Sequence, residues 1–146
     1  MKGAAIMKKQ KNPWLLDWAR SFMKRGLHLD VILKTEAPHE IAPYLRQGRL
    51  VGFFADQRPR SGGFPGHLFG RPIMIAPGPA ICARRYKAPM VVLTLTSRPD
   101  GSHVARVDPV STGGSLQELS QRWMSVLEDR IREHPEQWMW MHRRWK

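Results

Sequence analysis

Short apolar runs of strand length alternate along this chain with segments whose apolar residues recur at helical spacing. This alternation favours an α/β fold, in which a layered mixed sheet is flanked by helices. One of the strand pairs is separated only by a turn, so the sheet is expected to contain an antiparallel hairpin. The predicted strands are 4–7, 30–33, 50–55, 90–97 and 102–107, and the predicted helices are 13–26, 41–48, 79–86 and 115–131.

Several helix boundaries carry specific signals. Asn12 followed by Pro13 is typical of an N-cap with proline at the first helical position, and Gly26 is a stop signal. Ser115 and Glu118 form the pattern of a capping box at the start of the last helix. The apolar stripe of the first helix is Trp14, Leu15, Trp18 and Phe22, and the last helix has a stripe predicted to be core, Leu116, Leu119, Trp123, Val126, Leu127 and Ile131.

Turn residues divide the middle of the chain. Pro99, Asp100 and Gly101 separate two predicted strands and indicate a hairpin. The strand 50–55 is apolar except for Gly52 and is expected to be buried. The segment 56–72 that follows is rich in Gly, Pro and Arg, and we expect a long loop of functional importance there.

Length and charge bound the possible partners. A chain of 146 residues predicts a single domain over 1–146. Lys and Arg number 24 against 12 for Asp and Glu, and the net charge of +12 attracts anionic partners. The only cysteine, Cys82, lies in an apolar run, which predicts a small core residue and excludes a disulfide framework. No apolar run reaches the roughly 18 residues of a spanning helix, so membrane contact is expected at the surface.

Three segments carry a resemblance to a known family. One lies near the start of the chain, where Lys11-Asn12-Pro13 follows a short apolar strand. Another combines 45–48, which reads LRQG, with Asp56-Gln57 at a strand end and Leu68-Phe69-Gly70. The most specific is the tail 135–146, PEQWMWMHRRWK. In this order and spacing, over essentially the whole chain, they resemble the late acyltransferases of lipid A biosynthesis, the lauroyl and myristoyl transferases.

The resemblance implies a fold similar to that of glycerophosphate acyltransferases and a place at the cytoplasmic face of the bacterial inner membrane. It implies transfer of a fatty acyl group from an acyl-carrier-protein thioester to a hydroxyl of a lipid A precursor. The expected partners are therefore acyl-carrier protein, the lipid A precursor and an anionic membrane surface, with no nucleic acid. No cofactor is expected beyond the thioester donor.

The family's catalytic pair is a His followed five residues later by Asp or Glu. The imidazole removes the hydroxyl proton, and the carboxylate orients it. Of the six histidines only His103 has such a partner, Asp108. We reject this pair, because an odd offset in a strand places the side chains on opposite faces with Cα atoms up to about 17 Å apart. The family's pair belongs upstream of the Asn12-Pro13 helix. The chain is therefore expected to be the C-terminal portion of an acyltransferase domain, lacking the N-terminal part of the fold and inactive alone.

Asp56 ends a predicted strand, where α/β folds place their sites, and the family resemblance makes it the candidate supporting active-site acid. The alternative is a loop Asp that caps a local turn. Basic side chains around the predicted loop could hold phosphates or acidic sugars of the acceptor, or could simply be solvated. Lys8 stands where many family members have Arg, which keeps the charge but loses bidentate recognition. The predicted substrate-binding residues are Lys8, Gln57, Arg58, Arg60, Arg71, Arg143 and Arg144.

The tail suits a membrane interface, with the rings of Trp138, Trp140 and Trp145 at headgroup depth and Arg143 and Arg144 on anionic lipid. Alternatively the tryptophans pack on the core and leave the arginines in water, and the spacing of 138, 141 and 145 would place these residues on one inward helical face. His67 and His134 have no second ligand at metal-binding spacing in the sequence, so no metal is predicted.

Two other classes of function stay open. The chain could be a non-catalytic module that binds anionic lipid at a membrane surface, which the charge and the tail favour. A nucleic-acid binder would explain the charge alone, since the sequence has no helix-turn-helix, zinc-finger or single-strand-binding signature.

Overall fold

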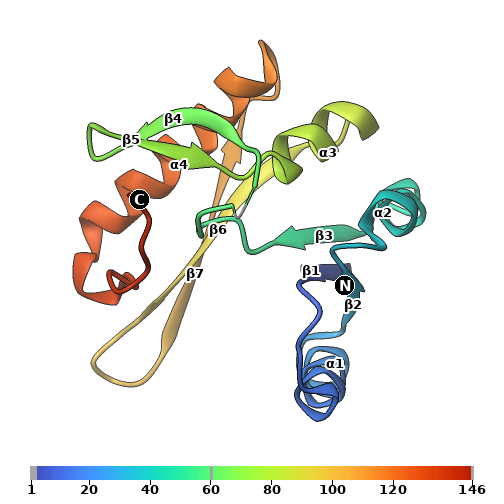
Figure 1. Cartoon of the computed structure of the whole chain (residues 1–146). Coiled ribbons are helices and arrows are strands. Elements are labelled where there is room, and N and C mark those ends of the chain that lie inside the picture. Colours follow the sequence, from blue (N-terminus) through green and yellow to red (C-terminus); the bar gives the residue numbers. More distant parts are fainter. Residues whose placement is uncertain (1–2, 60, 146) are drawn as a thin grey trace. The chain divides into compact units, whose positions relative to one another are not determined.

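The computed structural model describes residues 3–59 and 61–145 (Figure 1). These fall into two compact units, Met1–Phe54 and Ala55–Lys146. Four α-helices and three small sheets make up the described part, and this confirms the α/β class. The prediction of a single domain over 1–146 stays a prediction, and each unit is described by itself.

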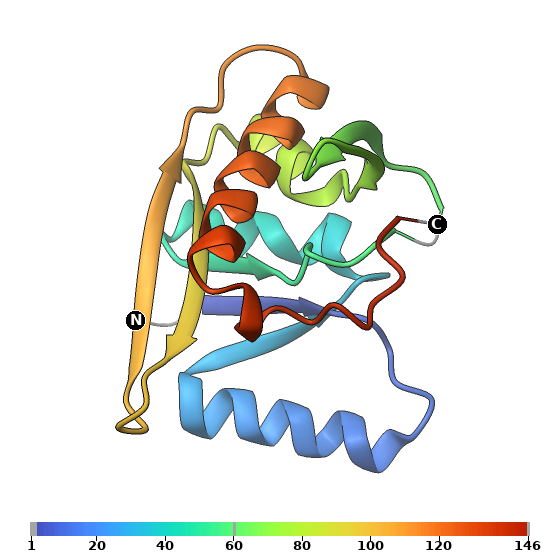
Figure 2. The ribbon, with the colours of Figure 1, turned by 90° about the vertical axis from the view of Figure 1, so that its left-hand side faces the viewer.

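The N-terminal unit is built on a parallel sheet. Its strands are β1 (Gly3–Met7), β2 (Leu29–Leu33) and β3 (Leu50–Phe53), in the order β2-β1-β3. Parallel neighbours require crossover connections. Helix α1 (Pro13–Leu27) supplies one and α2 (Ala37–Arg46) the other, and Figure 2 shows the two helices on either side of the strands.

The aromatic stripe of α1 does not face the sheet. Leu16 and Ala19 are the buried residues of this helix, whereas Trp14 is 83 % and Trp18 is 63 % exposed. The predicted burial of the strand 50–55 is also wrong. Leu50 is 53 % exposed, and Val51 and Phe53 are only partly buried.

The C-terminal unit contains two antiparallel hairpins. The first consists of β4 (Phe64–Leu68) and β5 (Arg71–Ile75), and the second of β6 (Met90–Ser97) and β7 (His103–Val110). Helix α3 (Gly78–Tyr86) connects the hairpins, and α4 (Leu116–Glu133) and the 3₁₀ turn η1 (Pro135–Gln137) follow them. The second hairpin was predicted. The first corrects the prediction of a continuous loop over 56–72.

The core of this unit forms around α4. Most of its predicted stripe is buried and packs with residues of the first hairpin and of α3, whereas Leu116 and Val126 are partly buried against the same cluster, which confirms the interpretation of this helix. Cys82 is also buried, and burial raises the pKa of its thiol. The core cluster is Leu68, Ile73, Ile75, Ala80, Ala83, Val110, Leu119, Trp123, Met124, Leu127 and Ile131.

Both predicted N-caps are present. The side chain of Asn12 accepts a hydrogen bond from the N–H of Trp14 at 3.0 Å, and Pro13 occupies the first helical position of α1. At α4, Ser115 and Glu118 form the reciprocal capping box. The predicted stop at Gly26 is two residues early, because His28 takes the left-handed C-cap conformation.

Candidate substrate-binding site

A tight turn at the tip of the first hairpin organises this site. Phe69 and Gly70 form the two-residue loop between β4 and β5, and their φ angles of 54° and 71° are typical of a type I′ turn. Glycine takes this conformation freely, but a bulky residue rarely does. Phe69 is held there because its N–H donates to Oε2 of Glu128 at 2.7 Å. A backbone strained in this way, and fixed by its surroundings, is a common feature of binding sites.

The C-terminal tail folds back onto this turn. The ring of Phe69 lies 5.7 Å from that of Trp140 and 6.4 Å from that of Trp145. The two indoles stack on each other at 6.3 Å with 12° between their planes. Trp145 also donates from Nε1 to the carbonyl of Leu68 at 3.3 Å. Two segments that carry the family resemblance, the tail and the Leu68-Phe69-Gly70 turn, therefore form one contact surface.

Two arginines lie on the faces of these rings. The guanidinium carbon of Arg71 is 5.4 Å from the centroid of Trp145, and that of Arg132 is 4.9 Å from the centroid of Phe69. Arg132 also pairs with Glu128 at 2.6 Å. A guanidinium stacked on a ring keeps its planar edge of donors available for a phosphate or carboxylate. We call Phe69, Arg71, Glu128, Arg132, Trp140 and Trp145 the tail–turn cluster.

The groups that contact Glu128 within the tail–turn cluster hold its carboxyl ionised. Burial acts to raise the pKa of Glu128. The hydrogen bond from the Phe69 N–H and the pairing with Arg132 outweigh it, so the pKa lies below its ordinary value. The carboxylate thus anchors both the strained turn and one of the stacked arginines.

Arg144 is buried, with 2 % of its surface exposed. Its Nη1 donates to the carbonyl of Met74 at 2.8 Å, and Nη2 lies 3.9 Å from Sδ of Met124. Burial lowers the pKa of Arg144, the negative charge of Asp56 opposes this shift, and the positive charge of Arg58 adds to it. Arginine stays protonated in proteins, so Arg144 is a buried cation, and the negative charge of Asp56 favours its charged form. This geometry differs from the expectation that Arg144 lies at the surface against lipid.

The other predicted residues lie in different surroundings. Asp56 is half-buried, and Gln57 and Arg58 are exposed beside it in sequence. Arg143 is exposed, whereas Arg60 lies outside the described residues. Lys8 is exposed after β1 in the N-terminal unit.

The tail itself is not the predicted helix. After η1 it continues in turns, and Met141, placed on the inward face by the spacing argument, is 90 % exposed. Trp138 and Trp145 pack against the core, whereas Trp140 is 48 % exposed and donates from Nε1 to the carbonyl of Pro135. The packing of Trp138 and Trp145 and the exposure of Arg143 follow the second interpretation, from which the buried Arg144 departs, and contact of the tail with a membrane stays a prediction.

The sequence as a whole decides the family. All 146 residues match the family of bacterial lipid A biosynthesis acyltransferases. The chain belongs to this family. A search among curated proteins gave no match. The resemblance carried by the tail, by the Asp56 and Phe69 segments and by the Asn12-Pro13 segment is therefore confirmed, together with a role as an acyltransferase in lipid A biosynthesis.

In this acyltransferase the one His and Asp at the family's spacing do not form a pair. Asp108 lies on the face of β7 directed to α4, where both of its oxygens accept from Arg130, at 2.9 and 3.2 Å. Nδ1 of His103 lies 3.0 Å from the hydroxyl of Ser97 instead. The rejection of His103 and Asp108 as a dyad is consistent with this geometry.

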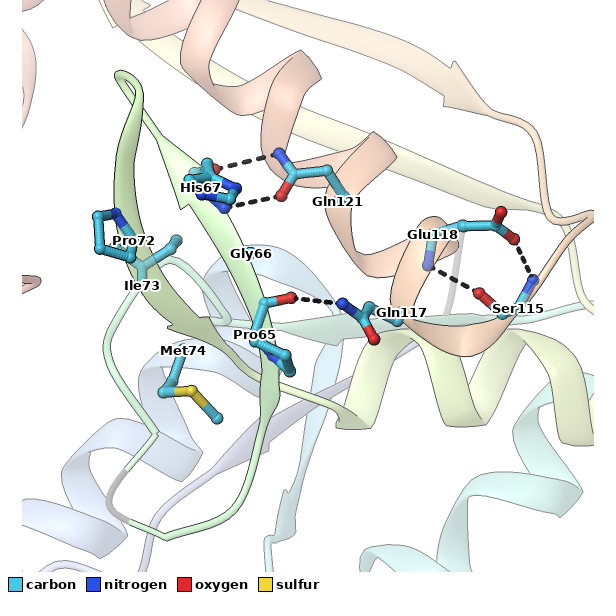
Figure 3. A pocket seen from close by; sticks show the side chains of 10 residues that line it. All are labelled: Pro65, Gly66, His67, Pro72, Ile73, Met74, Ser115, Gln117, Glu118 and Gln121. Atoms are coloured by element: carbon cyan, nitrogen blue, oxygen red, sulfur yellow. Dashed lines mark hydrogen bonds between the residues drawn. The ribbon is translucent and has the colours of Figure 1, made fainter.

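A surface groove of about 760 Å³ lies between the first hairpin and the first half of α4 (Figure 3). Its polar groups are engaged in structure. Gln121 accepts from the N–H of His67 at 2.8 Å and donates to its carbonyl at 3.1 Å, and Gln117 donates to the carbonyl of Pro65. Glu118 belongs to the capping box. These bonds fasten the hairpin to α4, so we assign the groove no part in acid–base chemistry.

Sequence reasoning missed the role of Glu128 and Arg132. They stand four residues apart on α4, a spacing that indicates no more than a helical ion pair, and this pair is present. Their contacts with Phe69 depend on the hairpin that was taken for a loop. The signal that could have found it was Phe69-Gly70 between Leu68 and the apolar run 73–75.

Two further searches cover residues 3–59 and 61–145. No group of three or more His, Cys, Asp or Glu side chains in these ranges could hold a metal ion. In the same ranges no helix has the length and apolar character needed to cross a membrane.

Proposed function

We propose that this lipid A biosynthesis acyltransferase takes its acyl group from acyl-carrier protein and delivers it to a hydroxyl of a lipid A precursor at the cytoplasmic face of the inner membrane. The family match over all 146 residues carries the proposal. The net charge of +12 supports it, because the carrier protein, the phosphorylated acceptor and the membrane surface are all anionic.

In this proposal the tail–turn cluster binds the acceptor. Arg71 is exposed on the face of Trp145 and offers a bidentate edge to a phosphate, and Arg58 adds a second exposed cation in the same unit. Asp56 serves as the supporting acid, since its negative charge favours the charged form of the buried Arg144, and Arg144 fixes the tail to Met74. The cluster thus positions the acceptor and does not itself perform the acyl transfer.

The chemical step requires a base that removes the proton of the acceptor hydroxyl. The hydroxyl oxygen then forms a bond to the thioester carbonyl carbon, the C–S bond breaks, and the carrier's thiol leaves with the proton. We infer that the 146 residues by themselves bind the acceptor but do not transfer the acyl group, because Asp108 is committed to Arg130 and not to His103.

The proposal is tested first by activity. The purified chain is incubated with acyl-carrier-protein thioester and a tetra-acylated lipid A precursor in detergent, and the product is followed by mass spectrometry. We expect no transfer by the chain alone, and transfer when it is fused behind a family segment that holds a His-X4-Glu pair. Transfer by the chain alone would refute the inferred inactivity, and a fusion that folds but stays inactive would count against the function.

Binding of the acceptor is tested separately by calorimetry with the lipid A precursor. Arg71→Lys keeps the charge but loses the planar edge and most of the ring stacking, so we expect about tenfold weaker binding. Arg98→Lys, at the turn between β6 and β7, is the matched control and should leave affinity unchanged. Equal affinities of the Arg71→Lys and unaltered chains would remove Arg71 from the proposed site.

The alternative, a non-catalytic module that binds anionic lipid, is favoured by the charge, by the Trp and Arg residues of the tail and by the rejected His103–Asp108 pair. It predicts that the fused chain stays inactive while the chain alone binds anionic vesicles in a salt-dependent way.

A further inference from the structure

An exposed aromatic stripe runs along α1. Trp14, Trp18 and Phe22 are spaced four residues apart and are 83 %, 63 % and 51 % exposed. Residues at this spacing lie on one side of a helix, one turn above the next. The rings of Trp18 and Phe22 stack at 5.4 Å between centroids. Leu15, also on α1, is 48 % exposed and widens the stripe.

This stripe is not the core face of its helix. Leu16 and Ala19 are buried, and α1 packs against β2. The helix therefore already has its attachment to the sheet, and the aromatic side chains are additional apolar surface. A contiguous exposed patch of large aromatic residues on a charged protein indicates a contact with a partner or a membrane.

The charges around the stripe favour a membrane over a protein partner. Lys11 precedes the helix, its first turn holds no acidic residue, and Lys24 and Arg25 lie in its last turn. Arg25 follows Phe22 by three residues, so it lies on the same side of the helix as the aromatic residues. Asp17, the one acidic residue of α1, lies 3.9 Å from Arg20. Tryptophan rings bordered by cations at both ends of a helix match the interface of an anionic bilayer.

We propose that α1 lies in the membrane interface, with Trp14, Trp18 and Phe22 inserted at headgroup depth and Lys11, Lys24 and Arg25 on anionic lipid. This inference rests on the membrane location in the proposed function and deepens it, because it moves the principal lipid contact from the tail to α1. The tail contributes less, since Trp145 and Arg144 are used to hold the tail on the core.

The test is co-sedimentation of the full 146-residue chain with vesicles of mixed phosphatidylglycerol and phosphatidylcholine, and with vesicles of phosphatidylcholine alone. The variant Trp14→Gln/Trp18→Gln/Phe22→Gln is expected to bind the mixed vesicles more than about tenfold more weakly, since three large rings no longer leave water. The control is Leu93→Gln/Leu95→Gln, which removes two apolar side chains exposed to 62 % and 63 % from β6, a strand that itself contains no Lys or Arg. It should bind like the unaltered chain.

A second variant, Lys24→Gln/Arg25→Gln, leaves every ring in place. It is expected to weaken binding about threefold to tenfold at low salt and to have little effect at high salt, because salt screens exposed charges. Circular dichroism confirms that each variant keeps its helices. The proposal is overturned if the aromatic and control variants lose binding equally, if neither loses it, or if the aromatic variant changes only the oligomeric mass.

The proposed function and the proposed membrane contact of α1 can be refuted independently of each other. Acyl transfer by the fused chain is measured in detergent, where no bilayer is present, so the aromatic variant should transfer at the unaltered rate. If the aromatic variant lost transfer in detergent while keeping vesicle binding, α1 would belong to the catalytic machinery and the interface proposal would fall.

Discussion

The helices α1 and α4 each carry a stripe of large apolar residues, yet they use it in opposite ways. Trp123 of α4 is 4 % exposed and lies in the core of the C-terminal unit. Trp14 of α1 is 83 % exposed. The two helices have similar amphipathic patterns but different neighbours. Helix α4 contacts both hairpins and α3, whereas α1 packs against β2.

The difference shows what an apolar stripe determines. The pattern marks one side of a helix as apolar, but the elements around the helix decide whether that side is covered. In α4 the stripe coincides with the packed face. In α1 the packed face is made by the smaller Leu16 and Ala19, and the aromatic residues lie beside it. A stripe of this second kind is available to a membrane.

The largest difference should appear when one tryptophan in each helix is replaced by alanine. Trp123→Ala leaves a cavity in the core and should lower the free energy of unfolding by about 3–5 kcal/mol. Trp14→Ala should change it by less than about 0.5 kcal/mol, because the side chain is mostly in water. Urea unfolding followed by circular dichroism measures both.

Trp123 offers a control within the same site. Its buried Nε1 has no hydrogen-bond partner among the described residues. Trp123→Phe removes this unpaired group while keeping a ring, so it should cost much less than Trp123→Ala. Similar losses of unfolding free energy for Trp123→Ala and Trp14→Ala would mean that the stripes of both helices are covered, and the proposed difference between α1 and α4 would be wrong.

A smaller effect distinguishes neighbouring leucines within α1. Leu16 is 7 % exposed and Leu15 is 48 % exposed. Leu16→Ala should therefore cost about 2–3 kcal/mol, near the lower end for buried leucines, and Leu15→Ala less than about 1 kcal/mol. The thermal midpoints of the two variants, measured side by side, give the order. The reverse order would show that α1 packs through its aromatic side.

Local signals in the sequence predicted much of this fold. The N-caps at Asn12 and Ser115, the hairpin around Asp100 and the strand 90–97 depend on neighbouring residues, and the structure confirms each. The hairpin over 64–75 was missed because its turn is Phe69-Gly70, which lacks the usual Asn or Asp. Its strand also contains Pro65 and Gly66, residues that are rare in strands.

The candidate site was predictable as a set of segments but not as a set of contacts. The family resemblance pointed to Asp56, to the Phe69 turn and to the tail. It did not show that Arg144 is buried and bonded to the carbonyl of Met74, since that depends on where the tail meets β5. Nor could helical spacing predict the tail, because η1 ends the helical path after Gln137.

The next effect concerns pH and is confined to the C-terminal unit. The pKa of Glu128 is depressed, so its contribution to stability is present above its ordinary value of 4.5 and is lost as the pH falls through the depressed value. Glu128→Gln should lower the free energy of unfolding by about 1.5 kcal/mol at pH 7. The difference between the two chains should shrink steadily below about pH 4.5. Urea titrations across this pH range measure it, and a pH-independent difference would mean that the charge of Glu128 does not hold the Phe69 turn.

The smallest effect compares the starts of the same two helices. Ser115 accepts from the N–H of Glu118 while Glu118 accepts from the N–H of Ser115, so Ser115→Ala breaks a reciprocal pair and should cost about 1–1.5 kcal/mol. Asn12 accepts from Trp14 only, and Asn12→Ala should cost about 0.5–1 kcal/mol. Ser115→Thr and Asn12→Asp keep a capping oxygen and serve as matched controls in thermal unfolding. If Asn12→Ala proved the costlier change, the start of α1 would be held by contacts beyond its cap, and the aromatic side chain of Trp14 next to it would be the first place to look for them.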